Sequence, residues 1–190
     1  AEAAAQMEQA LAVFRKVYPP SHEWVVRSAG RLASQYQSLG RSDEAEALIR
    51  KTLAEAGPPA ENTLVARKTR ARLQRTLADI RAGQQHWPAA EHEYRQALAL
   101  MQPVDAHDPN ALELQVDIAD AVGRQGRVDE AAALHRAAIE VSAEHVARRV
   151  PEAHTALLQR YGAWLEAMNR TAEATAFRDR HQIASGPAPR

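Results

Sequence analysis

The stretch Gly40-Arg41-Ser42-Asp43-Glu44-Ala45-Glu46-Ala47-Leu48 recurs later in the chain as Gly126-Arg127-Val128-Asp129-Glu130-Ala131-Ala132-Ala133-Leu134. The two alanines that anchor these stretches, Ala45 and Ala131, lie 86 positions apart, which is twice 43. A third copy lies midway between them, with Ala90 in the anchor position. Self-similarity at a fixed period of this length indicates a protein built from structural repeats.

Two further copies are anchored on Ala3 and Ala174, so successive anchors are separated by 42, 45, 41 and 43 residues. A large residue followed by a small one recurs in phase before the anchors, as in Leu32-Ala33 and Leu77-Ala78. Apolar residues spaced by three or four positions share one face of a helix. Each unit is therefore predicted to be two amphipathic helices joined by a short turn.

The composition supports an all-α chain. Ala, Leu, Arg, Glu and Gln favour helices, whereas the residues that favour strands are sparse. The net charge is zero and the chain contains no cysteine, which argues against a general nucleic-acid coat, a disulfide framework and a thiol nucleophile. No apolar run approaches the ~20 residues that span a bilayer. We expect a cytoplasmic protein, and the 21 arginines against 3 lysines suggest a GC-rich bacterial source.

Turn chemistry sets the predicted helix ends. Gly40, Gly83 and Gly126 lie where the first helix of a unit should stop. Ser42 and Thr171 are predicted to cap second helices. Asp108 is predicted to cap a first helix whose first turn contains Pro109. Second helices are predicted to end at the prolines Pro19-Pro20, Pro58-Pro59 and Pro103. The predicted helices are roughly 2–18, 22–39, 43–56, 61–82, 88–101, 109–124, 128–145, 151–168 and 171–184.

The pattern resembles that of tetratricopeptide repeats (TPR). The residues that carry the resemblance are Leu32-Ala33, Tyr36, Gly40, Ala45 and Ile49 in one unit. The common repeat has 34 residues. A period near 42 is similar to the kinesin-light-chain type. The resemblance implies a right-handed α-solenoid of antiparallel helix pairs.

We expect one array over residues 1–184, with a half repeat at 1–18, repeats at about 22–58, 61–103, 109–146 and 151–184, and a disordered tail at 185–190. Residues 1–18 correspond to a second helix without its first helix. We therefore expect the given sequence to be part of a longer protein, although an N-terminal capping helix is the alternative.

The resemblance also implies that the first helix of each pair lines a concave groove that binds peptides or partner helices. When the groove positions of the family are carried over onto this sequence, the predicted groove has a basic half, a neighbouring acidic patch and one arginine beyond that patch. The candidate groove residues are Arg27, Arg31, Ser34, Arg72, Arg75, Asp79, Glu113, Asp117, Asp120 and Arg160. Arginine suits bidentate recognition of carboxylates, so an acidic peptide segment is the expected ligand. The alternative is that these charges are solvated or pair with one another between neighbouring units.

The predicted function is therefore a non-enzymatic protein-interaction module that needs no cofactor. One alternative is a regulatory or sensory segment of a larger bacterial kinase or transcriptional regulator. A second is self-association through exposed repeat ends, so the chain is expected to be a monomer or to associate weakly.

No other group of residues in the sequence indicates a metal site or a nucleic-acid or membrane partner. The eight histidines lack a metal-binding spacing, and His135 falls at a core position. The basic run from Val65 to Arg75 lacks the interleaved aromatic residues of a nucleic-acid surface, and its charges spread around the helix. We therefore predict no metal site, no nucleic-acid partner and no membrane partner.

Overall fold

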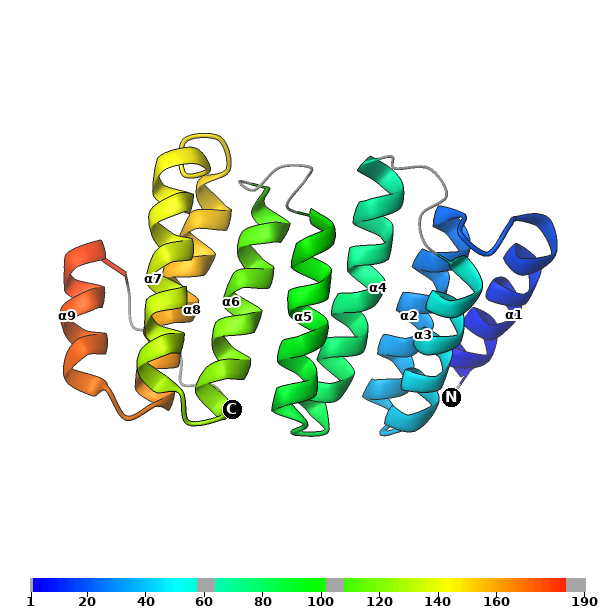
Figure 1. Cartoon of the computed structure of the whole chain (residues 1–190), viewed down its shortest axis with the longest axis horizontal. Coiled ribbons are helices and arrows are strands. Elements are labelled where there is room, and N and C mark those ends of the chain that lie inside the picture. Colours follow the sequence, from blue (N-terminus) through cyan, green and yellow to red (C-terminus); the bar gives the residue numbers. More distant parts are fainter. Residues whose placement is uncertain (1, 58–63, 102–107, 184–190) are drawn as a thin grey trace. The chain divides into compact units, whose positions relative to one another are not determined.

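The computed structural model describes residues 2–57, 64–101 and 108–183. These residues form only helices and the turns between them (Figure 1). The helices are α1 (Glu2–Val17), α2 (Glu23–Ser38), α3 (Ser42–Ala56), α4 (Leu64–Gly83), α5 (Trp87–Met101), α6 (Pro109–Arg124), α7 (Val128–His145), α8 (Pro151–Ala167) and α9 (Thr171–His181). They agree with the predicted helices to within a few residues. The predictions for Pro58-Pro59, Pro103 and the tail 185–190 lie outside the described residues.

The chain divides into two compact units, residues 1–104 and 105–190. In unit 1, α2 pairs with α3 and α4 pairs with α5, while α1 packs against α2. In unit 2, α6 pairs with α7 and α8 pairs with α9. Successive helices of each unit run in opposite directions (Figure 1). The all-α architecture of antiparallel helix pairs is therefore confirmed within each unit.

The anchor alanines make close pairing possible. Ala45, Ala90 and Ala131 have no exposed surface, and Ala174 is 1% exposed. A methyl side chain at this position lets the two helices of a pair approach each other closely, while larger side chains fill the space between successive pairs. The repeat period in the sequence therefore reflects the regular packing of helix pairs.

The turns between paired helices share one backbone feature. The residue five positions before the anchor is left-handed in all four pairs, with φ of 74° at Gly40, 60° at Gln85, 83° at Gly126 and 59° at Asn169. The prediction that the first helix stops at Gly83 is confirmed, since Gly83 is the last residue of α4, and the left-handed residue follows two positions later at Gln85. Glycine is favoured in this conformation but is not obligatory.

The predicted caps at Ser42 and Thr171 are wrong, since each is the first residue within its helix. The cap positions are held by Arg41 and Arg170, and neither makes a side-chain cap hydrogen bond. The cap at Asp108 is confirmed, because its carboxylate accepts a hydrogen bond from the Asn110 amide at 2.9 Å.

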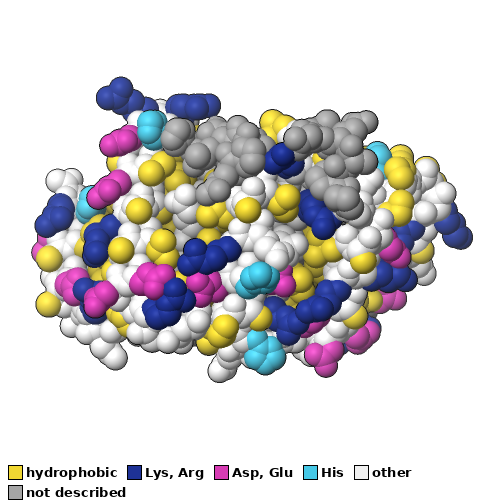
Figure 2. Space-filling model, viewed as in Figure 1, with side chains coloured by type: hydrophobic (Ala, Val, Ile, Leu, Met, Phe, Trp, Pro, Cys, Tyr) yellow, Lys and Arg dark blue, Asp and Glu magenta, His cyan; other side chains and the backbone are white. Residues whose placement is uncertain are grey.

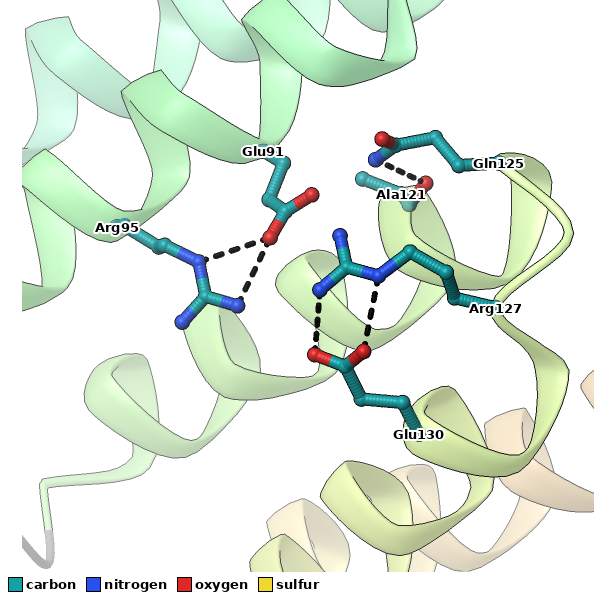
Figure 3. Close-up of polar contacts among 6 residues, drawn as sticks. All are labelled: Glu91, Arg95, Ala121, Gln125, Arg127 and Glu130. Atoms are coloured by element: carbon teal, nitrogen blue, oxygen red, sulfur yellow. Dashed lines mark hydrogen bonds and ion pairs between the residues drawn. The ribbon is translucent and has the colours of Figure 1, made fainter.

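Arginines at three second-helix starts form a recurrent ion pair instead of a cap. In Arg41–Glu44, Arg127–Glu130 and Arg170–Glu173, the guanidinium donates two hydrogen bonds to the carboxylate three residues later. Figure 3 shows the second of these pairs at the start of α7, with the Glu91–Arg95 pair of α5 also drawn. The negative charge lies in the first turn of the helix, where the helix dipole favours it.

Each unit has its own core. Val25, Ile49, Leu73 and Ile80 are fully buried in unit 1, and Leu112, Val116, Val122 and Leu165 in unit 2. On the face shown in Figure 2, basic and acidic side chains are intermingled rather than separated. Among the described residues, no helix is both long enough and apolar enough to cross a bilayer.

Candidate peptide-binding surface

The basic half of the predicted groove lies on α2 and α4, which pack against each other in unit 1. Each helix buries one face in the core and leaves the opposite face accessible. A methyl group added at Gly30 of α2 would lie 4.0 Å from the hydroxyl of Thr76 on α4, so the two accessible faces meet at these small residues. The structure thus brings Arg27 and Arg31 onto one helix and Arg72 and Arg75 onto its neighbour.

Two of these arginines are available to a ligand. The side chains of Arg31 and Arg72 are exposed, and neither makes a hydrogen bond or ion pair with any residue in the described part of the chain. Arg27 donates to Glu23 at 3.0 Å, and its guanidinium lies 5.7 Å from the centre of the Trp24 ring. Arg75 is half-buried.

The remaining predicted residues of unit 1 are held by local hydrogen bonds. The Ser34 hydroxyl donates to the Gly30 carbonyl at 3.1 Å. Asp79 accepts a hydrogen bond from the Tyr94 hydroxyl at 2.7 Å, which ties α4 to α5. Asp79 is therefore exposed but also makes a contact that joins two helices.

The acidic residues predicted for the other half lie on α6 in unit 2, where two of them are paired internally. Arg160 of α8 donates to Asp117 at 2.6 Å and to Asp120 at 3.0 Å. Asp117 is only 6% exposed, so the arginine offsets a charge that is almost fully desolvated. Of the three predicted acidic residues on α6, Glu113 alone is exposed.

The same cluster continues to a buried histidine. His135 of α7 has no exposed surface, and its Nε2 lies 3.1 Å from Asp120 Oδ1. Its ring stacks on Tyr161 at 5.1 Å between ring centres and tilts against Trp164 at 4.9 Å. Burial raises the pKa of Asp120, but the close contact with His135 and the charge of Arg160 outweigh it, so the pKa lies below its ordinary value.

The internal pairing had a sequence signal. Asp117 and Arg160 are 43 residues apart, which is one repeat period, so they occupy the same position in successive units. Residues at one repeat position become neighbours when helix pairs stack. Opposite charges one period apart therefore predict an ion pair between repeats.

The described residues contain no group of three or more side chains that could hold a metal ion. The basic and acidic residues lie in different units, so their joining in one groove remains a prediction. The candidate peptide-binding surface is therefore the one formed by α2 and α4 in unit 1.

Comparison with known proteins identifies the repeat. Residues 69–144 match the family model of the tetratricopeptide repeat. This stretch of the chain is therefore similar to tetratricopeptide repeats. The matched stretch includes the second turn, anchored on Ala90, and the third, anchored on Ala131. TPR units serve other proteins as interaction scaffolds, which supports that role for this chain.

Solved structures of TPR-like proteins share the fold. A putative kinesin light chain from Podosopora anserina, with nearly identical TPR-like repeats, has a TM-score of 0.72 and 22% identity over 94% of this chain and 83% of that one. A second crystal structure of that protein, of a variant form, has a TM-score of 0.72 and 21% identity over 96% and 88%. BtubC (BKLC) from P. vanneervenii has a TM-score of 0.71 and 21% identity over 97% and 78%. No curated protein sequence matches the chain.

Proposed function

We propose that this TPR chain binds an acidic peptide segment on the surface formed by α2 and α4. The observation that carries the proposal is the pair of exposed guanidinium groups of Arg31 and Arg72, which have no partner among the described residues. Most of the other arginines with a described contact are bound to a carboxylate, as in the three recurrent pairs at helix starts.

The chemistry of the surface supports a carboxylate ligand. A guanidinium presents its N–H groups in a planar fork that matches a carboxylate, and a hydrogen bond between charged groups contributes about 1.5–3 kcal/mol. Between the two arginines lie Gly30 and Thr76, whose small side chains leave room for a peptide backbone. The Thr76 hydroxyl donates to the Arg72 carbonyl at 3.0 Å, so its oxygen remains able to accept a hydrogen bond from a ligand amide.

The proposal is tested by selecting ligands from a display library of random 15-residue peptides. Peptides that bind are expected to be enriched in Asp and Glu. Synthetic copies are then titrated by fluorescence anisotropy against the unchanged chain and the double variant Arg31→Glu/Arg72→Glu. The double variant is expected to bind at least tenfold more weakly, since tenfold corresponds to about 1.4 kcal/mol.

The matched control is the double variant Arg50→Glu/Lys51→Glu on α3, which makes the same charge change on two exposed side chains of the same unit. It is expected to bind within twofold of the unchanged chain. Equal losses in both variants would show that net charge alone drives binding. That result, or selected peptides without acidic residues, would contradict the proposal.

The regulatory-segment alternative, the bacterial source and the cytoplasmic location stay predictions.

A further inference from the structure

Unit 2 contains a pocket that is lined by its last three helices, α7, α8 and α9. Its volume is about 470 Å³. Small-molecule sites in proteins have volumes of about 300–1,000 Å³, so the pocket is large enough for a ligand of that kind. The buried side chains of Tyr161 and Leu165 on α8 form its floor, and α7 and α9 supply its walls.

The repeat register explains why a pocket opens beside α9. The residue seven positions after the anchor is small and at most 1% exposed in three earlier second helices, where it is Thr52, Ala97 and Ala138. The same position of α9 is held by His181, which is exposed and lines the pocket. A histidine ring needs more room than these small side chains, so α9 cannot lie as close to α8 at this end.

The pocket lies on a face of α9 that the register does not assign to a following helix. In α1 and α7, the residue five positions after the anchor contacts a tyrosine of the next first helix. Glu8 accepts a hydrogen bond from the Tyr36 hydroxyl at 2.8 Å, and Arg136 donates to the Tyr161 hydroxyl at 3.3 Å. The corresponding residue of α9 is Asp179, which does not line the pocket. A further helix packed in register would therefore leave the pocket open.

The inner surface of the pocket is suited to an aromatic group. Phe177 of α9 meets the ring of Tyr161 edge-on, with 4.9 Å between the ring centres. Ile139 and Leu165 add aliphatic surface beside these rings. Aromatic rings prefer such edge-on or offset contacts with one another, and they gain from burial against aliphatic side chains.

The charged residues that line the pocket favour an anion. Arg136 lies on the α7 wall and Arg180 on the α9 wall, and neither guanidinium makes an ion pair with a described residue. Two carboxylates also line the pocket, but that of Glu173 accepts two hydrogen bonds from Arg170 and is thereby neutralised. Two guanidinium groups then remain against the single carboxylate of Glu140, so a ligand with one negative charge would balance the site.

We propose that this pocket binds a small aromatic carboxylate, with its ring against Tyr161 and Phe177 and its carboxylate between Arg136 and Arg180. The planar fork of a guanidinium matches the two oxygens of a carboxylate. All the lining residues belong to unit 2, whereas the proposed peptide surface belongs to unit 1, so the two sites are tested separately.

The chemical class of the ligand is tested with naphthylacetate, titrated against the 190-residue chain and followed by ligand-detected NMR. A ligand of this size is expected to bind with a Kd of about 1 mM or below. Naphthylacetamide lacks the charge and acetate lacks the ring, and each is expected to bind at least tenfold more weakly. Equal binding of naphthylacetate and naphthylacetamide would overturn the role of the arginines. Tighter binding of naphthylmethylamine, or no binding of naphthylacetate at about 10 mM, would overturn the proposal.

The location of the site is tested with variants whose side chains are exposed, so folding should be unaffected. Arg180→Gln is expected to bind naphthylacetate at least tenfold more weakly. The matched control Arg149→Gln, which removes the same charge in the turn before α8, should bind within twofold of the unchanged chain. Glu140→Gln removes the opposing carboxylate and should tighten binding by about twofold to fivefold, a gain that a folding defect cannot produce.

The double variant Arg31→Glu/Arg72→Glu separates this pocket from the peptide surface, and it should bind naphthylacetate within twofold of the unchanged chain. A loss of affinity in that variant as large as in Arg180→Gln would place the probe on the peptide surface and overturn the pocket as its site. Equal losses in Arg180→Gln and Arg149→Gln, or weaker binding in Glu140→Gln, would also overturn it.

Discussion

At the scale of single residues, Arg160 shows how position decides the role of a charge. By sequence it belongs to the same class of first-helix arginines as Arg31, and the repeat pattern predicts that both face a ligand. Arg160 instead binds Asp117 and Asp120, whereas Arg31 has Thr76 as its counterpart in the next repeat and makes no hydrogen bond or ion pair with a described residue. The residue one period away therefore determines whether an arginine is structural or available.

The cluster around Asp120 predicts a pH dependence of stability. The pKa of Asp120 is lower in the folded chain than in the unfolded chain, where it is near 3.9. Its contribution is therefore complete above about pH 4 and is lost as the pH falls through the folded value. Asp120→Asn should lower the free energy of unfolding by about 1 kcal/mol at pH 7, a figure reduced for partial solvent screening, and by less at pH 3.

The measurement is urea unfolding followed by circular dichroism at the two pH values. Asp129→Asn serves as the control, because the Asp129 side chain is 98% exposed and should change stability little at either pH. A loss in Asp120→Asn that is the same at pH 3 and pH 7 would mean that the carboxylate charge is not what stabilises the cluster.

At the scale of helices and turns, the left-handed residue before each second helix is the shared element. Gly40 and Gly126 meet this requirement at no steric cost, whereas Gln85 and Asn169 adopt it with a side chain. A residue other than glycine in this conformation costs about 1–2 kcal/mol, with less for Asn. The turn at Gln85 is thus held by the helices it joins rather than by its own preference.

Gln85→Gly is therefore expected to stabilise unit 1 by about 0.5–1 kcal/mol, the relief of backbone strain exceeding the added freedom of the unfolded chain. Gly126→Ala is the reciprocal change and should destabilise unit 2 by about 1 kcal/mol. A methyl group there would meet nothing within 4 Å, so the effect comes from the backbone alone. Thermal unfolding midpoints test both, and a lower midpoint for Gln85→Gly would contradict the account.

The sequence predicted the helices well because their signal is periodic and is repeated in every unit. It predicted Gly83 correctly as the end of a helix, but glycine content did not reveal the left-handed residue Gln85, which distance from the anchor selects. It predicted Ser42 as a cap wrongly because residue type alone does not show where the helix begins. The free state of Arg31 and the pairing of Arg160 depend on side-chain contacts between repeats, which the charge pattern along single helices did not reveal.

At the scale of the whole molecule, each compact unit has its own core, so a destabilising substitution in one unit should have little effect on the other. Gly123 of α6 leaves room for the ring of Trp164 on α8, since a methyl group there would lie 2.9 Å from two ring atoms. Gly123→Ala is therefore expected to destabilise unit 2 by about 1–3 kcal/mol through overpacking. In a repeat protein, contacts are mainly with nearest neighbours, so helices α1 to α4 should be little affected.

Hydrogen–deuterium exchange read by mass spectrometry measures this directly. Exchange should quicken in α6 to α9 of Gly123→Ala and remain as in the unchanged chain in α1 to α4. The control is Gly30→Ala, where the nearest atom lies 4.0 Å from the added methyl group, so the helix should be stabilised slightly. Faster exchange throughout the Gly123→Ala chain would show that the two units unfold as one.

The Asp117–Arg160 pair has a consequence for how such a protein can grow. Tandem duplication is the simplest genetic route to a longer array, and it places identical modules side by side. A duplicated module containing Asp117 would set that carboxylate against its own copy, nearly buried and with no counter-ion, while a module carrying Arg160 would oppose arginine with arginine. The two repeats joined by this pair are thus not interchangeable, because each supplies the charge that the other requires.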